Sequence, residues 1–572
     1  MILAKLKEYA DTRMDLPPAM YRSQPVRWFI NLNAEGQLEG FTPLGGTSKT
    51  DKRGMDFVVP DVIRTGNIKA KVLVDNGEYV LGIGKEGTAT SKVMARFQNF
   101  KEVLQTCYVE TQESDVLAVI RFLETWQPSP EQIKKLPLGF DSGDTIAFRV
   151  NDNNPAELPS VQQFWARYTS ASSDSSPNTA QCLITGEMTS VEARMPGKVK
   201  GIPGGQTSGT SLVSANAQAF EHYGLKNSLT SPISRDAAER FTKALNHLIS
   251  DENSRLYVGT LIYTFWTRKE TKFNAWKLLS NPKPEDVKLL FQSPFSGNEV
   301  HQLVSDEFYA LALSASGGRA VIRDWLETTI SEAQKNLARY FKAQEICTQD
   351  GMATDHHAIF PLVSSLYRDF KKEVTANIPA HFIRVAIKGG VMPLEILEKA
   401  VRRTRAESDL THPRIAAIKL ALSTQPRGEV FMELTKLDPD PPLEMRDAQA
   451  YQCGRLLAEL EAIQRAALGK INATIVDRYY GSASSTPQSG FAPLLSGVQA
   501  HLSKLRKNRP GAYVAKQKAL EDILKKFPVK NQIPQFPSTL TMREQGIFAI
   551  GYYHQRADNR AAAELASTKG AI

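Results

Sequence analysis

The sequence predicts an α+β fold, in which a large mixed α/β N-terminal and central region is followed by an all-α C-terminal helical bundle. Up to about residue 428, short β-rich runs alternate with segments whose apolar residues recur at helical spacing. Proline-rich segments at 425–428 and 438–442 then interrupt the chain, and mainly helical spacing follows them. Because 572 residues exceed one hydrophobic core, we expect domains at residues 1–170, 171–428 and 432–572.

The first domain is expected to be mixed α/β because short alternating runs and helical spacing both occur in it. Its expected elements are, in order, a strand at 25–33, a hairpin turn at 33–36, alternating segments at 69–82 around a second turn at 75–77, helices at 91–108 and 114–126, and a Ser-rich loop at 170–178.

The central region is expected to begin with β structure and to become helical. Its expected elements are a helix at 234–250, β structure at 255–266, a strand pair at 308–323 broken at 317–318, and helices at 325–341, 359–375, 380–388, 393–405 and 413–422.

The C-terminal region reads as helices joined by short connections, a pattern typical of an up-down bundle. The helices are expected at 446–472, 473–485, 491–507, 516–527 and 541–566.

The charge balance favours a polyanionic partner. The formal net charge is +9, from 70 Lys and Arg against 61 Asp and Glu, and residues 432–572 hold 19 basic and 13 acidic residues. No apolar run approaches the roughly 18 residues of a membrane span. Lys5, Lys7 and Glu8 interrupt any signal-peptide core, so a cytoplasmic location without membrane contact is expected. The four cysteines form no C-x-x-C pair, which argues against a disulfide framework or a cysteine-built zinc site.

The most informative segment is the glycine-rich block within residues 181–224. Gly201, Gly204, Gly205 and Gly209 lie within nine residues of one another, close to Lys198 and Lys200. Glycines let a backbone approach a flat or charged partner closely, and the lysines supply charge for a phosphate backbone. A surface loop that needs positive φ angles is the alternative interpretation.

A series of short motifs runs along the whole chain. The central signature reads C-x-x-T-G-E, then K-G-x-x-G-G-Q-x-S-G, then F-x-x-Y-G. Other landmarks are Leu16-Pro17-Pro18, Asp75-Asn76-x-x-Tyr79-Val80-Leu81-Gly82, Arg319-x-x-x-Arg323-Asp324-Trp325, Gly454-Arg455-Leu456 and Gln545-Gly546-x-Phe548-Ala549-x-Gly551-Tyr552. Each landmark alone is weak, whereas the ordered set is specific: it resembles the large subunit of the type I-C CRISPR surveillance complex, Cascade.

The resemblance implies a non-catalytic subunit with no cofactor. Such a subunit recognises the protospacer-adjacent motif in target double-stranded DNA, helps to open the duplex and stabilises the R-loop. The implied partners are guide RNA (crRNA), target DNA, displaced single-stranded DNA, the Cascade backbone and guide-processing subunits, and a separate helicase-nuclease. It also implies that an internal translation start, at Met432 or Met445, can yield the C-terminal bundle as a separate small subunit.

Candidate DNA-binding residues are short-range basic and amide groups and the glycine block. They are Lys69, Lys71, Asn76, Lys85, Lys198, Lys200, Gly204, Gly205, Gln206 and Ser208. Where this family typically has asparagine, this chain has Lys71. In the bundle, the candidates for holding a nucleic-acid backbone are Lys504, Arg506, Lys507, Arg509, Lys516, Lys518, Lys525 and Lys526. For the N-terminal and bundle candidates the alternative is exposed solubilising charge, and for the glycine block it is the surface loop described above.

Two alternatives from other classes stay open. Asp355, His356 and His357 could centre a metal-dependent nuclease, although adjacent residues on a helix point in different directions and need distant partners to build a site. A generic basic scaffold for structured RNA is the other. The Gly82–Thr88 segment lacks the spacing of a P-loop, and no G-x-S-x-G elbow occurs.

Overall fold

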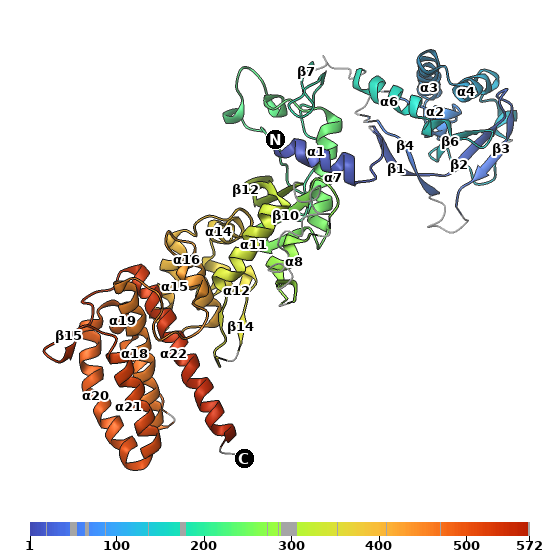
Figure 1. The fold of residues 1–572 in the computed structure, drawn as a ribbon. Helices are drawn as coiled ribbons and strands as arrows, with labels where there is room; N and C mark the ends of the chain where they lie inside the picture. The colour runs from blue at the N-terminus through green and yellow to red at the C-terminus, as the bar shows by residue number, and fades with distance from the viewer. Residues whose placement is uncertain are drawn as a thin grey trace, which may run out of the picture. The chain divides into compact units, whose positions relative to one another are not determined.

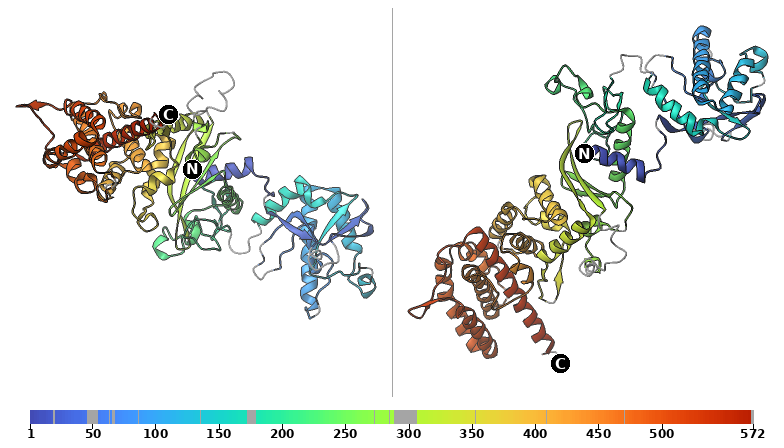
Figure 2. Two further views of the ribbon diagram at one scale, coloured as in Figure 1. Left: turned by 90° about the horizontal axis from the view of Figure 1, so that it is seen from below. Right: turned by 45° about the horizontal axis from the view of Figure 1, so that its top comes forward.

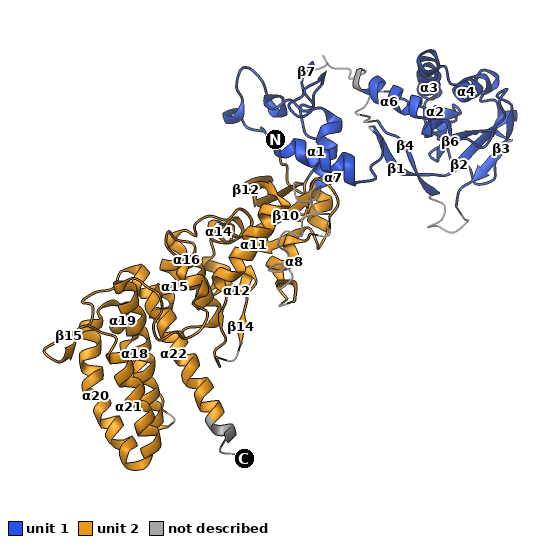
Figure 3. Cartoon of the chain, viewed as in Figure 1, with its two compact units in different colours: residues 1–198, 213–244 blue, residues 199–212, 245–572 orange. Residues whose placement is uncertain are grey.

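The computed structural model describes residues 1–572 apart from 19, 46–53, 63, 65–67, 86, 135, 172–178, 272, 284, 288–305, 352, 408, 470 and 570–572. The chain forms two compact units (Figure 3). Unit 1 comprises Met1–Lys198 and Val213–Ala244, and unit 2 comprises Val199–Leu212 and Leu245–Ile572. This division differs from the expected boundaries, because residues 428–432 lie inside unit 2.

Unit 1 contains a four-stranded sheet with the strand order β3-β2-β6-β5. The strands are β2 (Trp28–Leu32), β3 (Leu38–Pro43), β5 (Val74–Asn76) and β6 (Thr145–Val150). The expected turn between β2 and β3 is confirmed: the Gly36 N–H donates to the Asn33 carbonyl at 3.0 Å, with φ of Gly36 at +83°. Helices α3 (Thr90–Thr111) and α4 (Ser114–Thr125), both expected, contribute Phe100 and Phe122, whose rings contact Phe148 of β6.

The other elements of unit 1 lie outside this sheet (Figure 1). They are α1 (Ile2–Arg13), β1 (Tyr21–Val26), β4 (Met55–Pro60), α2 (Gly77–Val80), α5 (Pro130–Ile133), α6 (Pro159–Ala171), β7 (Thr179–Gln181), β8 (Met188–Ser190) and the first part of α7 (Arg235–Ser250). Most of the expected Ser-rich loop lies outside the described residues.

Two expectations for this unit were wrong in detail. The strand expected at 25–33 is divided at Arg27, because β1 pairs with β4 while β2 joins the four-stranded sheet. The second hairpin is absent from the described residues around 75–77, where β5 runs directly into α2. Asn76 caps this short helix, and side-chain capping favours helix over a β-turn at that point.

Unit 2 contains the β structure expected around residues 255–323, as a four-stranded antiparallel sheet with the order β12-β11-β10-β9. Its strands are β9 (Arg255–Val258), β10 (Leu261–Thr267), β11 (Glu307–Ser316) and β12 (Arg319–Thr329). Helices α11 (Ile330–Gln344) and α14 (Asn377–Lys388) pack against β12, as Figure 2 shows for the long strands and the helices beside them. The helix expected from 325 begins later, since the strand continues to Thr329, whose hydroxyl caps α11.

The rest of unit 2 is mostly helical, as expected, although the helix expected at 359–375 is split in two. The elements are α8 (Ala275–Ser280), β13 (Ile346–Cys347), β14 (Thr354–Asp355), α12 (Ile359–Ser364), α13 (Phe370–Glu373), α15 (Leu394–Glu407), α16 (His412–Ser423), α17 (Val430–Glu433), α18 (Met445–Leu468), α19 (Ile475–Ser485), α20 (Pro487–Asn508), α21 (Pro510–Leu524), β15 (Val529–Lys530), β16 (Ile533–Pro534) and α22 (Met542–Lys569).

One hydrophobic core runs through unit 2, from the sheet into the C-terminal helices. Helix α22 contacts α15 and α16 as well as α18, so the bundle shares its core with the helices that precede the proline-rich segments. The α+β fold class is thus confirmed, with mixed sheets followed by a helical C-terminal region. Across the described residues, none of the helices combines the length and apolar character that crossing a bilayer requires.

Candidate nucleic-acid interface

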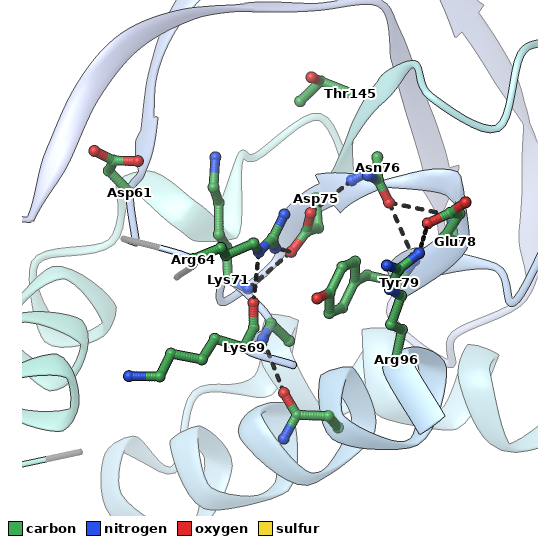
Figure 4. Close-up of polar contacts among 12 residues, drawn as sticks. Asp61, Arg64, Lys69, Lys71, Asp75, Asn76, Glu78, Tyr79, Arg96 and Thr145 are labelled. Carbon is green, nitrogen blue, oxygen red and sulfur yellow. Dashed lines mark hydrogen bonds and ion pairs between the residues drawn. The ribbon is translucent and has the colours of Figure 1, made fainter. Parts of the chain in front are cut away.

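A buried ionic network lies where β5 meets α2 (Figure 4). Asp75 is 3% exposed, and its carboxylate forms an ion pair with Arg64 and accepts hydrogen bonds from the Lys71 N–H at 2.9 Å and the Asn76 N–H at 2.8 Å. Burial raises the pKa of Asp75, while the charge of Arg64 opposes that rise. The Arg64 guanidinium also lies 4.2 Å from the centroid of the Tyr79 ring. These contacts hold the segment around residue 75 in one conformation.

Lys71 is part of this interior rather than an exposed reader of DNA. It is 5% exposed, and its Nζ donates to Gln24 Oε1 at 3.0 Å. Burial lowers the pKa of Lys71, and the carboxylates of Asp75 and Asp61 act against that shift. The sequence placed Lys71 among exposed basic groups because its hydrogen-bond partner, Gln24, lies 47 positions away in the chain. The structure assigns its amine to the support of the β1–β5 region.

The other N-terminal candidates lie closer to solvent. Asn76 is half-buried, and its Oδ1 accepts hydrogen bonds from the N–H groups of Glu78 at 3.2 Å and Tyr79 at 3.4 Å. Its Nδ2 group donates no hydrogen bond within the described chain. Lys69 is half-buried and its side chain points away from Asp75 in Figure 4, whereas Lys85 is exposed. The backbone at Asn76 is therefore held in place, while its side-chain amide donates no hydrogen bond among the described residues and can donate one to a ligand.

Sequence reasoning missed Arg64 and Gln24. Arg64 anchors Asp75, and Gln24 connects Lys71 to β6, because its Nε2 donates to Thr145 Oγ1 at 3.1 Å. The only sequence signal for this network was the Asp75-Asn76 landmark, which carries no information about partners elsewhere in the chain.

The glycine loop, residues 200–209, is closed at its base by a pair of backbone hydrogen bonds. The Val199 N–H donates to the Thr210 carbonyl at 2.8 Å, and the Thr210 N–H donates to the Val199 carbonyl at 2.7 Å. Gly201 and Gly204 have φ angles of +79° and +73°, in the left-handed region that side chains disfavour. A Cβ at Gly205 would lie 2.9 Å from Thr210 Cγ2, so this position also requires glycine.

The glycine loop rests on the hairpin between β11 and β12. The Ser211 N–H donates to the Gly318 carbonyl, and the Ala320 N–H donates to the Ser211 carbonyl, each at 2.9 Å. The predicted Lys200, Gly204, Gln206 and Ser208 are exposed, as is Lys198 just before the loop. Within the part of the chain that the structure describes, the N–H groups of Gln206, Thr207 and Ser208 donate no hydrogen bond. The loop thus presents successive backbone N–H groups as hydrogen-bond donors, and hydrogen bonds to the hairpin between β11 and β12 hold its base in place.

The eight basic candidates of the bundle fall into two groups. Five are exposed and form no ion pair among the described residues: Lys504, Arg506, Lys507, Arg509 and Lys518. The other three have acidic partners: Lys516 with Glu459 at 3.1 Å, Lys525 with Asp522 at 3.4 Å and Lys526 with Asp440 at 2.5 Å. Glu459 is fully buried, so the prediction for Lys516 has to be revised: its amine serves the bundle interior.

Asp355, His356 and His357 do not form a metal-binding arrangement. His357 Nε2 is hydrogen-bonded to His412 Nδ1, and the His357 N–H donates to Gln344 Oε1 at 2.9 Å. Burial, with the charge of His412 second, lowers the pKa of His357 to about 4. No group of three or more His, Cys, Asp or Glu side chains suited to a metal ion occurs among the residues that the structure describes. The nuclease alternative therefore has no support.

A known protein family matches this chain over most of its length. The model of a family described as CRISPR-associated protein (Cas_Csd1) matches residues 3–559, which is nearly the whole chain. No curated protein matches. The matched range includes the Asp75 network, the glycine loop and the C-terminal helices. The chain therefore belongs to the Csd1 family of CRISPR-associated proteins.

Proposed function

We propose that this chain is the large, non-catalytic subunit of a type I-C Cascade. It recognises the protospacer-adjacent motif in duplex DNA, helps to open the duplex, stabilises the R-loop and supports recruitment of the helicase-nuclease. Family membership over residues 3–559 supports a place in a Cascade-type CRISPR complex. By analogy with another RNA-guided effector, base pairing with the guide RNA reads the target sequence and the protein reads only a short motif.

The glycine loop is the observation that carries this proposal. Successive backbone amides without an acceptor among the described residues are suited to phosphate oxygens, and the open space where a side chain at Gly204 would stand lets a strand approach them. The hydrogen bonds between Val199 and Thr210 hold these donors in place before DNA arrives, which lowers the entropic cost of binding. Lys198 and Lys200 add positive charge beside the amides.

Motif reading is proposed for the region of Asn76. The ionic network fixes the backbone there, and Asn76 Nδ2 can donate to acceptors on base edges. In a minor groove such donors distinguish mainly A·T from G·C pairs and respond to groove width. Lys69 and Lys85 would then contribute phosphate contacts on either side.

The test replaces Lys198 and Lys200 with Ala in the assembled complex and measures binding to a duplex that carries the motif. The slope of log affinity against log salt should decrease by about 0.9 for each lost phosphate contact. The matched control is Lys371→Ala with Lys372→Ala. Both lysines are exposed on α13, so replacing them removes the same positive charge outside the glycine loop. If both pairs behave alike while the complex assembles normally, the glycine loop has only a structural role.

The absence of catalysis is tested separately. The purified chain, incubated with labelled duplex and single-stranded DNA in the presence of Mg²⁺ or Mn²⁺, should leave both substrates intact. Cleavage that disappears on replacing His356 would instead establish a nuclease.

A further inference from the structure

Two arginines on α22 frame a small recess in unit 2 that sequence reasoning did not single out. Arg556 and Arg560 lie one helical turn apart, and both are half-buried. The recess is also lined by Gln349, Leu410, Tyr553 and Ala557. Residues four apart project from the same side of a helix, so both guanidinium groups can reach one bound group.

Among the described residues, neither arginine forms an ion pair with an acidic side chain. The Arg560 Nη1 donates to the Gln349 carbonyl at 3.4 Å and to Gln349 Oε1 at 3.2 Å, and both acceptors are uncharged. The Arg556 guanidinium lies 5.9 Å from the centroid of the Tyr552 ring. Burial, and secondly the charge of Arg556, lower the pKa of Arg560.

Tyr553 adds a donor without an acceptor. It is 4% exposed, and its hydroxyl is buried without a hydrogen-bond partner in the described structure although the residue lines the recess. A buried hydroxyl without a hydrogen-bond partner is unfavourable, so an acceptor that enters the recess would stabilise it.

We propose that this recess binds a phosphodiester group of a single nucleic-acid strand, with Arg556 and Arg560 as the cations and the Tyr553 hydroxyl as a further donor. The planar fork of arginine matches two phosphate oxygens at once, which a lysine amine does not. The neighbouring α21, tied to α22 by the hydrogen bond from Lys516 Nζ to Asn559 Oδ1 at 3.1 Å, carries the exposed Lys518. This proposal rests on the proposed function, in which the chain stabilises the R-loop, and on the expectation from the sequence that the bundle holds a nucleic-acid backbone.

The experiment uses the purified full-length chain and a labelled single-stranded oligonucleotide of mixed sequence, with affinity measured by fluorescence anisotropy over a series of salt concentrations. Arg556→Gln should reduce the salt slope by about 0.7, the value for one phosphate contact on a single strand, and adding Arg560→Gln should reduce it further. Tyr553→Phe, which keeps the ring, should weaken binding at constant slope. Arg556 donates no hydrogen bond within the described part of the chain, so its replacement is not expected to disturb folding.

The matched control is Lys335→Gln with Arg339→Gln, an exposed basic pair also one turn apart, on α11. If the Arg556 and Arg560 variants bind the oligonucleotide as this control does, the proposal is overturned. It is also overturned if inorganic phosphate alone raises the melting temperature through these arginines while strand binding does not depend on them. If the variants bind the oligonucleotide normally but fail to join the complex, the recess would be assigned to an acidic partner protein. That outcome would also overturn the proposal.

Motif preference is measured on the same samples in the assembled complex. The Arg556 variant should keep the preference for the correct duplex motif, because the motif residues lie in unit 1. Absence of any motif preference in the unaltered complex would contradict the proposed function and leave the phosphate recess standing.

Discussion

The ion pair between Glu459 and Lys516 allows a sharp test of which basic residues of the bundle serve the fold. Glu459 of α18 is fully buried, and Lys516 of α21 lies 3.1 Å from its Oε1. Neither carboxylate oxygen of Glu459 accepts a hydrogen bond among the described residues, so Lys516 is its principal compensation. The Lys516 side chain itself keeps 23% exposure.

Replacing Lys516 with Met leaves the Glu459 charge buried without its partner. Removing one member of a buried pair costs about 3–5 kcal/mol, and we expect about 3 kcal/mol because water can approach from the side of Lys516. Lys518→Met, two residues further along α21 and exposed, should change stability by no more than about 0.5 kcal/mol. Since the two units need not unfold together, hydrogen exchange of peptides from α18 and α21 is the appropriate measurement.

A double variant completes the design. Glu459→Met combined with Lys516→Met should recover most of the hydrogen-exchange protection that Lys516→Met alone loses. Replacing a buried ion pair with apolar side chains of similar volume is often neutral for stability. The reasoning is refuted if peptides from α18 and α21 show the same hydrogen-exchange protection in the Lys516→Met variant as in the Lys518→Met variant. It is also refuted if Lys516→Met, at a temperature where it is folded, lowers the salt slope of single-strand binding as a phosphate contact would.

Three further predictions concern other sites. Asn76→Asp should keep the cap of α2 but lose discrimination between the correct and a wrong motif in duplex competition. Asn76→Ala should lose the same discrimination and also about 1 kcal/mol of stability, because the cap is removed. Unchanged discrimination in both variants would remove Asn76 from the site. The pKa of His357, about 4, lies below its unfolded value of about 6.5, so its contribution to stability is complete above the unfolded pKa and is lost as the pH falls toward 4. His357→Gln should therefore flatten the decrease in melting temperature over that range, and an unaltered decrease would assign it to other groups. Changing Met432 and Met445 to Leu should remove a C-terminal product of roughly 15 kDa, and a product that survives both changes would contradict an internal start.

Local patterns in the sequence predicted most of the helices well. The helix expected at 114–126 is α4, and each helix expected beyond residue 445 has a counterpart among α18 to α22. Helical spacing of apolar residues is a local property, so it can be read without knowledge of partners. The glycine block was equally readable, because left-handed φ angles and close contacts restrict its residue types directly.

The roles of individual charged residues were decided by tertiary structure. Lys71 and Lys518 look alike in the sequence, yet one amine donates to Gln24 in the interior and the other side chain is exposed. Lys516 and Lys518 differ by two positions, and only Lys516 faces the buried Glu459. A charge is stabilised by water or by a partner, and that partner can lie far away along the chain. Sequence alone therefore determined the fold class, most of the helices and the glycine loop, while tertiary packing determined which basic groups are exposed and which are paired in the interior.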